Sequence, residues 1–172
     1  QFPLRHSAII LDLKKVEEIK AAVSLFPDEI HGFVHAAGVA SLVPLRSMSY
    51  NRMDEIMRIN FYSFLEIVKI ISAKKKLGAN FLTSVVAISS LASSSGSKGQ
   101  TLYAASKSSL ESASVSLSKE FVQKAIRFNT IKPGLVLTEM TYHWMLKAGY
   151  DDVKDIEKLQ LNGPASVSDV AN

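Results

Sequence analysis

The sequence predicts an α/β fold with a doubly wound parallel sheet. Short, nearly continuous apolar segments, typical of strands buried on both faces of a sheet, alternate with segments whose apolar residues recur every three or four positions. This alternation of strand and helix is typical of right-handed βαβ units. The length of 172 residues, with 47% hydrophobic and 21% charged residues, is that of one globular domain of ordinary composition.

The first half of the chain predicts two strands, each followed by a helix. Residues 8–13 form the first apolar segment, and a helical pattern follows until Pro27 ends it. Residues 30–37 form the next predicted strand. Ser49 is placed to cap a long helix that continues to about residue 76.

The second half predicts two more strands and a long helix. Residues 81–88 are rich in β-branched residues, which indicates a strand, and residues 126–131 form the fourth. A helical pattern covers residues 101–124, after a Ser-rich stretch with the composition of a loop. Residues 165–172 look like the capped start of a further helix.

Ligands of a doubly wound sheet bind at the carboxyl ends of its strands. Asp12, Gly38, Ser90 and Gly134 lie at or just after the four predicted ends. We therefore expect these four residues to border one crevice.

The composition excludes several classes of site and partner. The chain has no cysteine, which excludes disulfide bonds, thiol catalysis and zinc–thiolate sites and is typical of a reducing cytoplasm. The four histidines are not spaced with carboxylates as metal ligands, so we expect no metal site. The net charge of +4 is spread without a basic face, so we expect no nucleic-acid partner.

Membrane insertion is not expected either. No apolar run reaches the ~18 residues that span a bilayer. The first residues show no basic stretch followed by an apolar one, as a secretion signal would. We therefore expect a cytoplasmic protein without a membrane partner.

Two polar residues interrupt otherwise apolar patterns. Asn60 lies within the apolar stripe of the helix predicted after Ser49, and a buried amide must find hydrogen-bond partners. On its own it is interpreted as a core residue that satisfies backbone groups of a loop. Ser90 lies at a strand end, but no Gly-x-Ser-x-Gly motif of a hydrolase nucleophile surrounds it.

Tyr103 and Lys107 lie four positions apart on a predicted helix and therefore share a face. A pair at this spacing is ordinarily a solvated surface contact. Here the mainly apolar stripe of the helix continues on the same face, which favours a position toward the sheet. The stripe consists of Leu110, Ser114, Leu117 and Phe121. A nearby cation lowers the pKa of a phenol, so such a tyrosine can exchange a proton with a carbonyl oxygen.

Four motifs occur in order along the chain: Asn60, Ile88-Ser89-Ser90, Tyr103-Ala-Ala-Ser-Lys107, and the segment 129–138 with Pro133-Gly134 at its centre. Together they resemble the short-chain dehydrogenase/reductase family over nearly the whole chain. The resemblance implies a Rossmann-like fold and an NAD- or NADP-dependent oxidoreductase. Its reaction would be hydride transfer that reduces a small-molecule carbonyl or oxidises a secondary alcohol. A homo-oligomer, dimer or tetramer, is also implied.

The resemblance implies a role for each catalytic residue. Tyr103 would be the acid/base, and Lys107 would lower its pKa and hold the nicotinamide ribose. Ser90 would hydrogen-bond the substrate carbonyl, and Asn60 would position a water that relays protons to Lys107. The protein would then supply position and a proton, while the cofactor transfers the hydride.

Cofactor contacts follow from the same resemblance. Asp12 would contact the adenine, and Val136 and Thr138 the nicotinamide carboxamide. The family's Asn-Asn-Ala-Gly motif stands here as His35-Ala36-Ala37-Gly38, a variant that also resembles ketoreductase domains of polyketide synthases. The residues assigned to the cofactor are Asp12, His35, Ala36, Gly38, Tyr103, Lys107, Pro133, Gly134, Val136 and Thr138.

One expected feature is missing. The glycine-rich turn that holds the pyrophosphate is not seen, because no two of the eight glycines are spaced as Gly-x-Gly. We therefore expect residues 1–172 to be a single partial domain without the first strand, the glycine-rich turn, the second strand and the last strand. Three functions stay open: an NAD(P)-dependent reductase or dehydrogenase, a non-catalytic binding or scaffolding module on the same fold, and a ketoreductase domain of a larger synthase.

Overall fold

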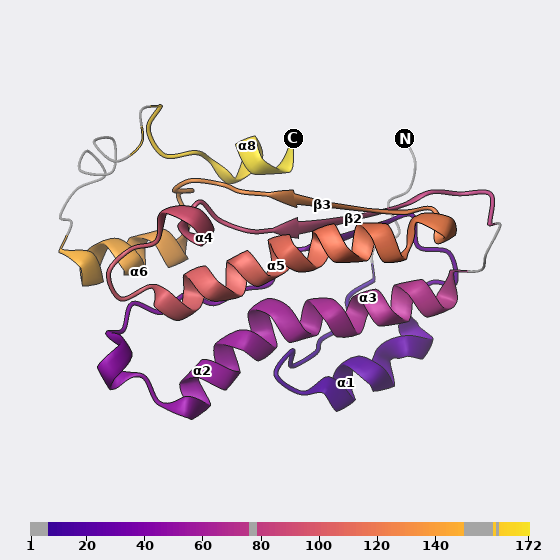
Figure 1. Ribbon diagram of the computed structural model, residues 1–172, viewed down its shortest axis with the longest axis horizontal. Helices are drawn as coiled ribbons and strands as arrows, with labels where there is room; N and C mark the ends of the chain where they lie inside the picture. The colour runs from indigo at the N-terminus through magenta and orange to yellow at the C-terminus, as the bar shows by residue number, and fades with distance from the viewer. Residues whose placement is uncertain (1–6, 76–78, 150–159, 161) are drawn as a thin grey trace.

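Helices and parallel strands alternate along the chain and form one sheet with helices packed on it (Figure 1). The computed structural model describes residues 7–75, 79–149, 160 and 162–172. The predicted α/β fold, in an incomplete form, is confirmed by this arrangement.

The sheet has three strands in the part of the chain that the structure describes, in the order β1 (Gly32–His35), β2 (Thr83–Ile88) and β3 (Ile126–Ile131). All pairs are parallel, and the register aligns Phe33 with Val85 and Val85 with Phe128. Each strand falls within a segment predicted as a strand. The three carboxyl ends therefore lie at one edge of the sheet, as expected of a ligand-binding edge.

The strand predicted over residues 8–13 is not formed. Residues 7–12 have no regular secondary structure, and Ile10 is 97% exposed. A strand exists only through backbone hydrogen bonds to a neighbouring strand, and none of the three described strands pairs with this segment. Its apolar sequence alone therefore does not make it a strand.

The helices of the first half begin and end close to the predicted residues. Helix α1 (Val16–Ala21) continues as a 3₁₀ turn over Ala22–Leu25 and ends before Pro27. The hydroxyl of Ser49 accepts a hydrogen bond from the backbone N–H of Arg52 at 3.3 Å, so Ser49 caps the next helix as predicted.

This capped helix is long and contains one irregular turn. It runs as α2 (Tyr50–Met57), a π-helical turn (Arg58–Tyr62) and α3 (Ser63–Lys74). Asn60 lies on the π-helical turn, a feature often found at functional sites.

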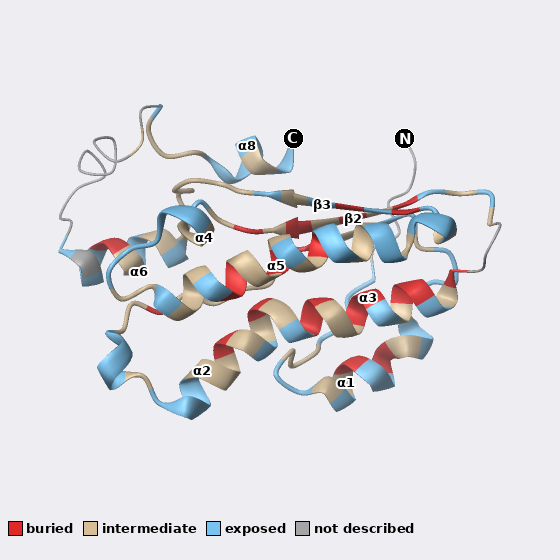
Figure 2. Cartoon of the chain, in the orientation of Figure 1, coloured by how far each residue is buried: buried red, intermediate tan, exposed pale blue. Residues whose placement is uncertain are grey.

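Helix α5 (Thr101–Glu120) packs beside α3 on the sheet, and Figure 2 shows buried residues where α3 lies against α1 and where it faces α5. Along β2 the buried residues alternate with less buried ones, because successive side chains point to opposite faces. One hydrophobic core joins α3, α5 and the strands: Phe64, Val68, Val85, Ala87, Leu110, Ile126 and Phe128. This core fixes α5 against β2 and β3.

The remaining short helices gather at the carboxyl edge of the sheet. They are α4 (Ala92–Ser95), α6 (Glu139–Ala148) and α8 (Val167–Ala171). Ser166 and Asp169 form a capping box before α8, which confirms the helix start predicted there. No helix among the described residues is both long and apolar enough to cross a bilayer.

Candidate active site

Helix α5 brings Tyr103 and Lys107 to the carboxyl edge of the sheet. Lys107 is only 4% exposed, and its Nζ donates a hydrogen bond to the carbonyl oxygen of Ile88, the last residue of β2, at 2.8 Å. The same Nζ lies 5.9 Å from the centre of the Tyr103 ring. The predicted position of the pair, facing the sheet, is therefore confirmed.

Ser90 lies directly across from Tyr103, in the loop after β2. Its hydroxyl accepts a hydrogen bond from the backbone N–H of Ala92 at 3.2 Å. The two hydroxyls expected to meet a substrate oxygen are near enough for Ser90 to act on the pKa of the Tyr103 phenol. A carbonyl oxygen placed between them would have two donors.

Burial sets the protonation of the Tyr103–Lys107 pair. It raises the pKa of the Tyr103 phenol, and the hydrogen bond from Ser90 opposes this shift only in part. The net shift is upward and is caused by burial, so the lowering of this pKa by Lys107 stays a prediction. Burial also lowers the pKa of Lys107 from 10.5 to about 8. Tyr103 is consequently a neutral phenol at neutral pH.

Asn60 is fully buried on the π-helical turn, and its amide holds the loop after β1. Its Oδ1 accepts from the backbone N–H of Val39 at 2.8 Å. Its Nδ2 donates to the carbonyl oxygen of Val39 at 3.0 Å and to the hydroxyl of Ser106 at 2.9 Å. Both amide donors are used, so these contacts favour the core interpretation, and the water relay to Lys107 stays a prediction.

We expect Asn60→Leu to lower the free energy of unfolding by roughly 2 kcal/mol, because the N–H and C=O of Val39 would lose a partner in a buried place. Urea unfolding of the full-length protein measures the loss. Asn51→Leu, at an exposed position of α2, is the matched control and should change stability by no more than about 0.5 kcal/mol. Equal stabilities of the two variants would contradict the core role.

A cavity of about 430 Å³ opens at this edge of the sheet. Most of the residues predicted for the cofactor and catalysis line it: Ala36, Gly38, Ser90, Tyr103, Lys107, Pro133, Gly134, Val136 and Thr138. A second cavity of about 360 Å³ shares Ser90, Tyr103 and Gly134 and extends toward Leu91, Leu135 and Trp144. Tyr103 and Ser90 therefore stand where the two cavities meet.

Gly38 leaves the space that the first cavity needs beside Lys107. A Cβ atom at this position would lie 3.1 Å from the Nζ of Lys107 and 3.6 Å from the Oδ1 of Asn60. Any larger residue would crowd the ammonium, whereas the distance to the amide is an ordinary contact. The close approach of the Lys107 side chain therefore explains why glycine occupies the last position of the His35-Ala36-Ala37-Gly38 motif.

Two residues predicted for the cofactor, His35 and Asp12, do not line the cavity. Side chains alternate along β1, so Val34 faces the cavity and His35 faces the helices. His35 is only 2% exposed, and its Nε2 lies 3.1 Å from the carbonyl oxygen of Asn60. Burial lowers the pKa of His35 to about 4, so it is neutral near pH 7. Asp12 accepts a hydrogen bond from the backbone N–H of Lys14 instead.

The sequence did not indicate that the end of the chain would line the cavity. Val136 forms a parallel bridge with Ala165, and this bridge places α8 beside the cavity. Val167, Val170 and Ala171 then line the cavity. The capping box marked where α8 begins, but no local signal indicated what α8 contacts. No group of three or more His, Asp or Glu residues that could hold a metal occurs among the described residues.

Comparison with known proteins agrees with this geometry. The family described as enoyl-(acyl carrier protein) reductase matches residues 3–172. The chain belongs to the short-chain dehydrogenase/reductase family. The family members similar to it include a 3-oxoacyl-[acyl-carrier-protein] reductase FabG of Chlamydia trachomatis, which is 33% identical over 141 residues, or 78% of this chain and 55% of that protein.

Other family members show the same partial coverage. Carbonyl reductase family member 4 of Xenopus laevis is 31% identical over 140 residues, covering 79% of this chain and 58% of its own length. This chain thus spans little more than half of these curated relatives. A solved structure, a putative NAD(P) dependent gluconate 5-dehydrogenase from Beutenbergia cavernae, shares the fold with a TM-score of 0.84 at 20% identity, over 95% of this chain and 66% of that one.

Proposed function

We propose that the full-length protein is an NAD(P)-dependent oxidoreductase that interconverts a carbonyl and a secondary alcohol. The observation that carries this proposal is that Ser90 and Tyr103 lie together beside the buried Lys107, at the junction of two cavities. Membership of the family supports it, and so do the relatives named as reductases.

The first cavity fits the nicotinamide ribose of a dinucleotide. Gly38 leaves room beside the Lys107 ammonium, which has hydrogens to donate to ribose hydroxyls in addition to its bond with Ile88. Val136 and Thr138 line the same cavity and would hold the carboxamide end. Solved relatives are described as complexes with NADH and with NADP, which supports either cofactor. A bound nicotinamide would supply or accept the hydride at the carbon of the substrate carbonyl.

The chain's own residues would supply position and the proton. In the reducing direction Ser90 donates a hydrogen bond to the carbonyl oxygen, and the neutral Tyr103 phenol transfers its proton to that oxygen as the hydride reaches the carbon. One hydride and one proton then give the alcohol, and the phenolate remains. In the oxidising direction the phenolate takes the proton back.

Oxidation of NADH and of NADPH by the full-length protein, followed by absorbance with a panel of ketones, tests the proposal. The panel includes a 3-oxoacyl thioester and a ketose, because relatives are named 3-oxoacyl-[acyl-carrier-protein] reductase and L-xylulose reductase. We expect turnover with at least one pair of cofactor and ketone. Cofactor binding without any turnover would favour the non-catalytic module, and a much longer parent chain would favour the synthase domain.

The homo-oligomer, dimer or tetramer, is proposed from the family resemblance, and the cytoplasmic location stays a prediction. Light scattering on the full-length protein tests the first of these. A monomer mass would contradict it.

A further inference from the structure

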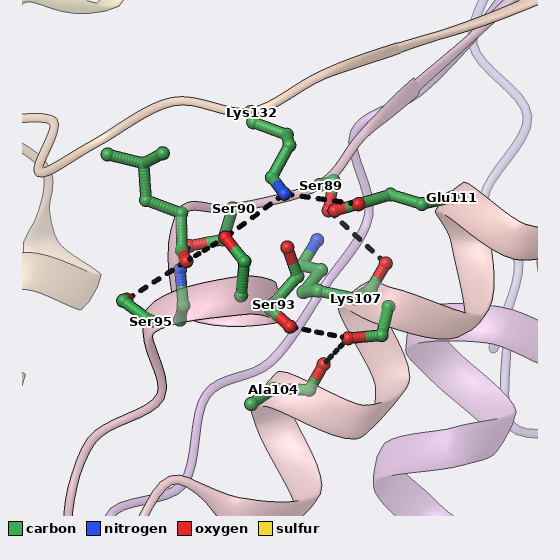
Figure 3. Close-up of polar contacts among 12 residues, drawn as sticks. Ser89, Ser90, Ser93, Ser95, Ala104, Lys107, Glu111 and Lys132 are labelled. Atoms are coloured by element: carbon green, nitrogen blue, oxygen red, sulfur yellow. Dashed lines mark hydrogen bonds and ion pairs between the residues drawn. The ribbon is translucent and has the colours of Figure 1, made fainter.

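A cluster of three polar residues, Ser89, Glu111 and Lys132, borders the candidate site, and Ser89 is part of the lining of the first cavity. Each member is close in sequence to a part of the site: Ser89 precedes Ser90, Glu111 lies one helical turn after Lys107 on α5, and Lys132 precedes the Pro133-Gly134 turn. In Figure 3 these three side chains point toward one another, Ser89 and Lys132 from the residues directly after β2 and β3 and Glu111 from α5. The proposed reaction uses none of them directly.

Glu111 is the centre of this cluster. Its Oε1 accepts a hydrogen bond from the Ser89 hydroxyl at 2.5 Å, and its Oε2 accepts one from the Nζ of Lys132 at 3.2 Å. Lys132 also donates to the hydroxyl of Ser94 at 3.2 Å, which links α4 to the cluster. One carboxylate therefore connects the ends of β2 and β3 to α5.

The hydrogen bonds that Glu111 accepts are charge-assisted, because its side chain is a carboxylate. Hydrogen bonds to an ionised group are shorter and stronger than those between neutral groups. Ser89 is 3% exposed, so its hydroxyl needs a partner, and the Lys132 and Glu111 side chains are only 32% and 27% exposed. The hydrogen bonds from Ser89 and Lys132 help to lower the pKa of Glu111, against the opposing effect of burial. The carboxylate is thus ionised at neutral pH.

The fold itself does not need this cluster. Strands β2 and β3 are already joined by their ladder up to Ile88 and Ile131, and the hydrophobic core holds α5 against them. Beyond the ladder, the N–H of Leu91 donates to the carbonyl oxygen of Pro133 at 2.9 Å, but this bond joins two loops and does not reach α5. Side chains set the position of these loops relative to the helix that carries Tyr103 and Lys107. The Ser89 hydroxyl also lies 3.2 Å from the carbonyl oxygen of Lys107, the Ser108 hydroxyl donates to the carbonyl oxygen of Ser93 at 2.8 Å, and Glu111 adds the charged link.

We propose that Glu111 is a positioning residue for the proposed reaction. By holding Ser89 and Lys132 it sets where Ser90 and the Pro133-Gly134 turn stand relative to Tyr103 and Lys107. The proposal rests on the proposed function, because misplacing reacting groups by about 1 Å is enough to slow a reaction roughly 10²-fold.

Glu111→Gln and Lys132→Met in the full-length protein test the proposal. Glutamine keeps an acceptor for Ser89 but loses the charge, so we expect kcat to fall roughly 10-fold with little change in KM for the ketone. Lys132→Met should have a smaller effect, and the double variant should be no slower than Glu111→Gln alone, because both changes break the same link. Glu66→Gln, which breaks the Glu66–Lys69 pair on α3, is the matched control and should leave kcat unchanged.

Hydrogen exchange by mass spectrometry gives a measurement that does not depend on turnover. We expect faster exchange over residues 89–95 and 131–136 in Glu111→Gln, and no change there in Glu66→Gln. Unchanged exchange in these segments would overturn the proposal, whether or not the protein turns over a ketone. A lower melting temperature with unchanged kcat would also overturn it, since the role would then be structural only. The unmodified protein could fail to turn over any ketone while Glu111→Gln still shows the expected faster exchange. That result would contradict the proposed function but not the role of Glu111 in holding these segments.

Discussion

Tyr103→Phe is expected to lower kcat by at least ~10²-fold while the protein stays folded. The substitution removes one hydroxyl, the proton donor of the proposed reaction, and keeps the ring against the same helix and cavity walls. The interaction lost with Ser90 is one between two neutral hydroxyls at the cavity edge, so its cost to stability is no more than about 1 kcal/mol. Activity and stability should therefore respond very differently.

Steady-state kinetics and thermal unfolding of the full-length variant measure the two effects. Tyr50→Phe is the matched control, because Tyr50 is 80% exposed on α2 and its hydroxyl is remote from the cavity lining. We expect the control to keep normal kcat and normal stability. Turnover within a few-fold of normal in Tyr103→Phe would remove Tyr103 from the mechanism.

Local patterns in the sequence were sufficient to find the centre of the site. The four-residue spacing of Tyr103 and Lys107 fixes a shared helical face, and the apolar residues that follow show that this face is turned inward. The segments that became β2 and β3 are β-branched and closely bounded by turns. Each of these signals is contained within a few residues, and the structure confirms each of them.

The features that the sequence did not predict depend on contacts between distant residues. Residues 8–13 have the composition of a strand, but a strand needs a neighbour to pair with. His35 belongs to a recognisable motif, yet the pleat of β1 turns its side chain away from the cavity. Glu111 meets Ser89 and Lys132 across 22 and 21 residues of sequence, and nothing local marks these three residues as partners.

The pKa of Tyr103 shows why chemistry is harder to predict than position. A lysine one turn away indicates a lowered pKa, but burial of the phenol has the larger effect and raises it. The same burial lowers the pKa of Lys107. Burial depends on the whole fold, so neither direction can be obtained from the spacing of the two residues alone.

Lys107→Met is expected to abolish most activity and to weaken cofactor binding, while the protein becomes no less stable at pH 7. The proposed reaction needs the ammonium to hold the ribose, and methionine offers no donor. The effect of the substitution on the free energy of unfolding is favourable at pH 7, in contrast to its effect on activity. Holding a charged lysine in this buried place costs about 3 kcal/mol at pH 7, from the lowering of its pKa from 10.5 to about 8. Loss of the hydrogen bond to Ile88 costs the variant only about 1 kcal/mol.

The pH dependence of stability separates these effects. Between pH 8 and pH 10 the unfolded chain keeps the Lys107 proton while the folded protein releases it, so the unfolding free energy of the unmodified protein rises with pH. Lys107→Met lacks this contribution, so its advantage at pH 7 should shrink steadily across that interval. Urea unfolding at several pH values, with Lys98→Met at an exposed loop position as the control, measures the difference. A parallel pH dependence in both proteins would contradict the lowered pKa of the buried Lys107. A Lys107→Met variant with normal cofactor affinity would contradict Lys107 as the group that holds the ribose.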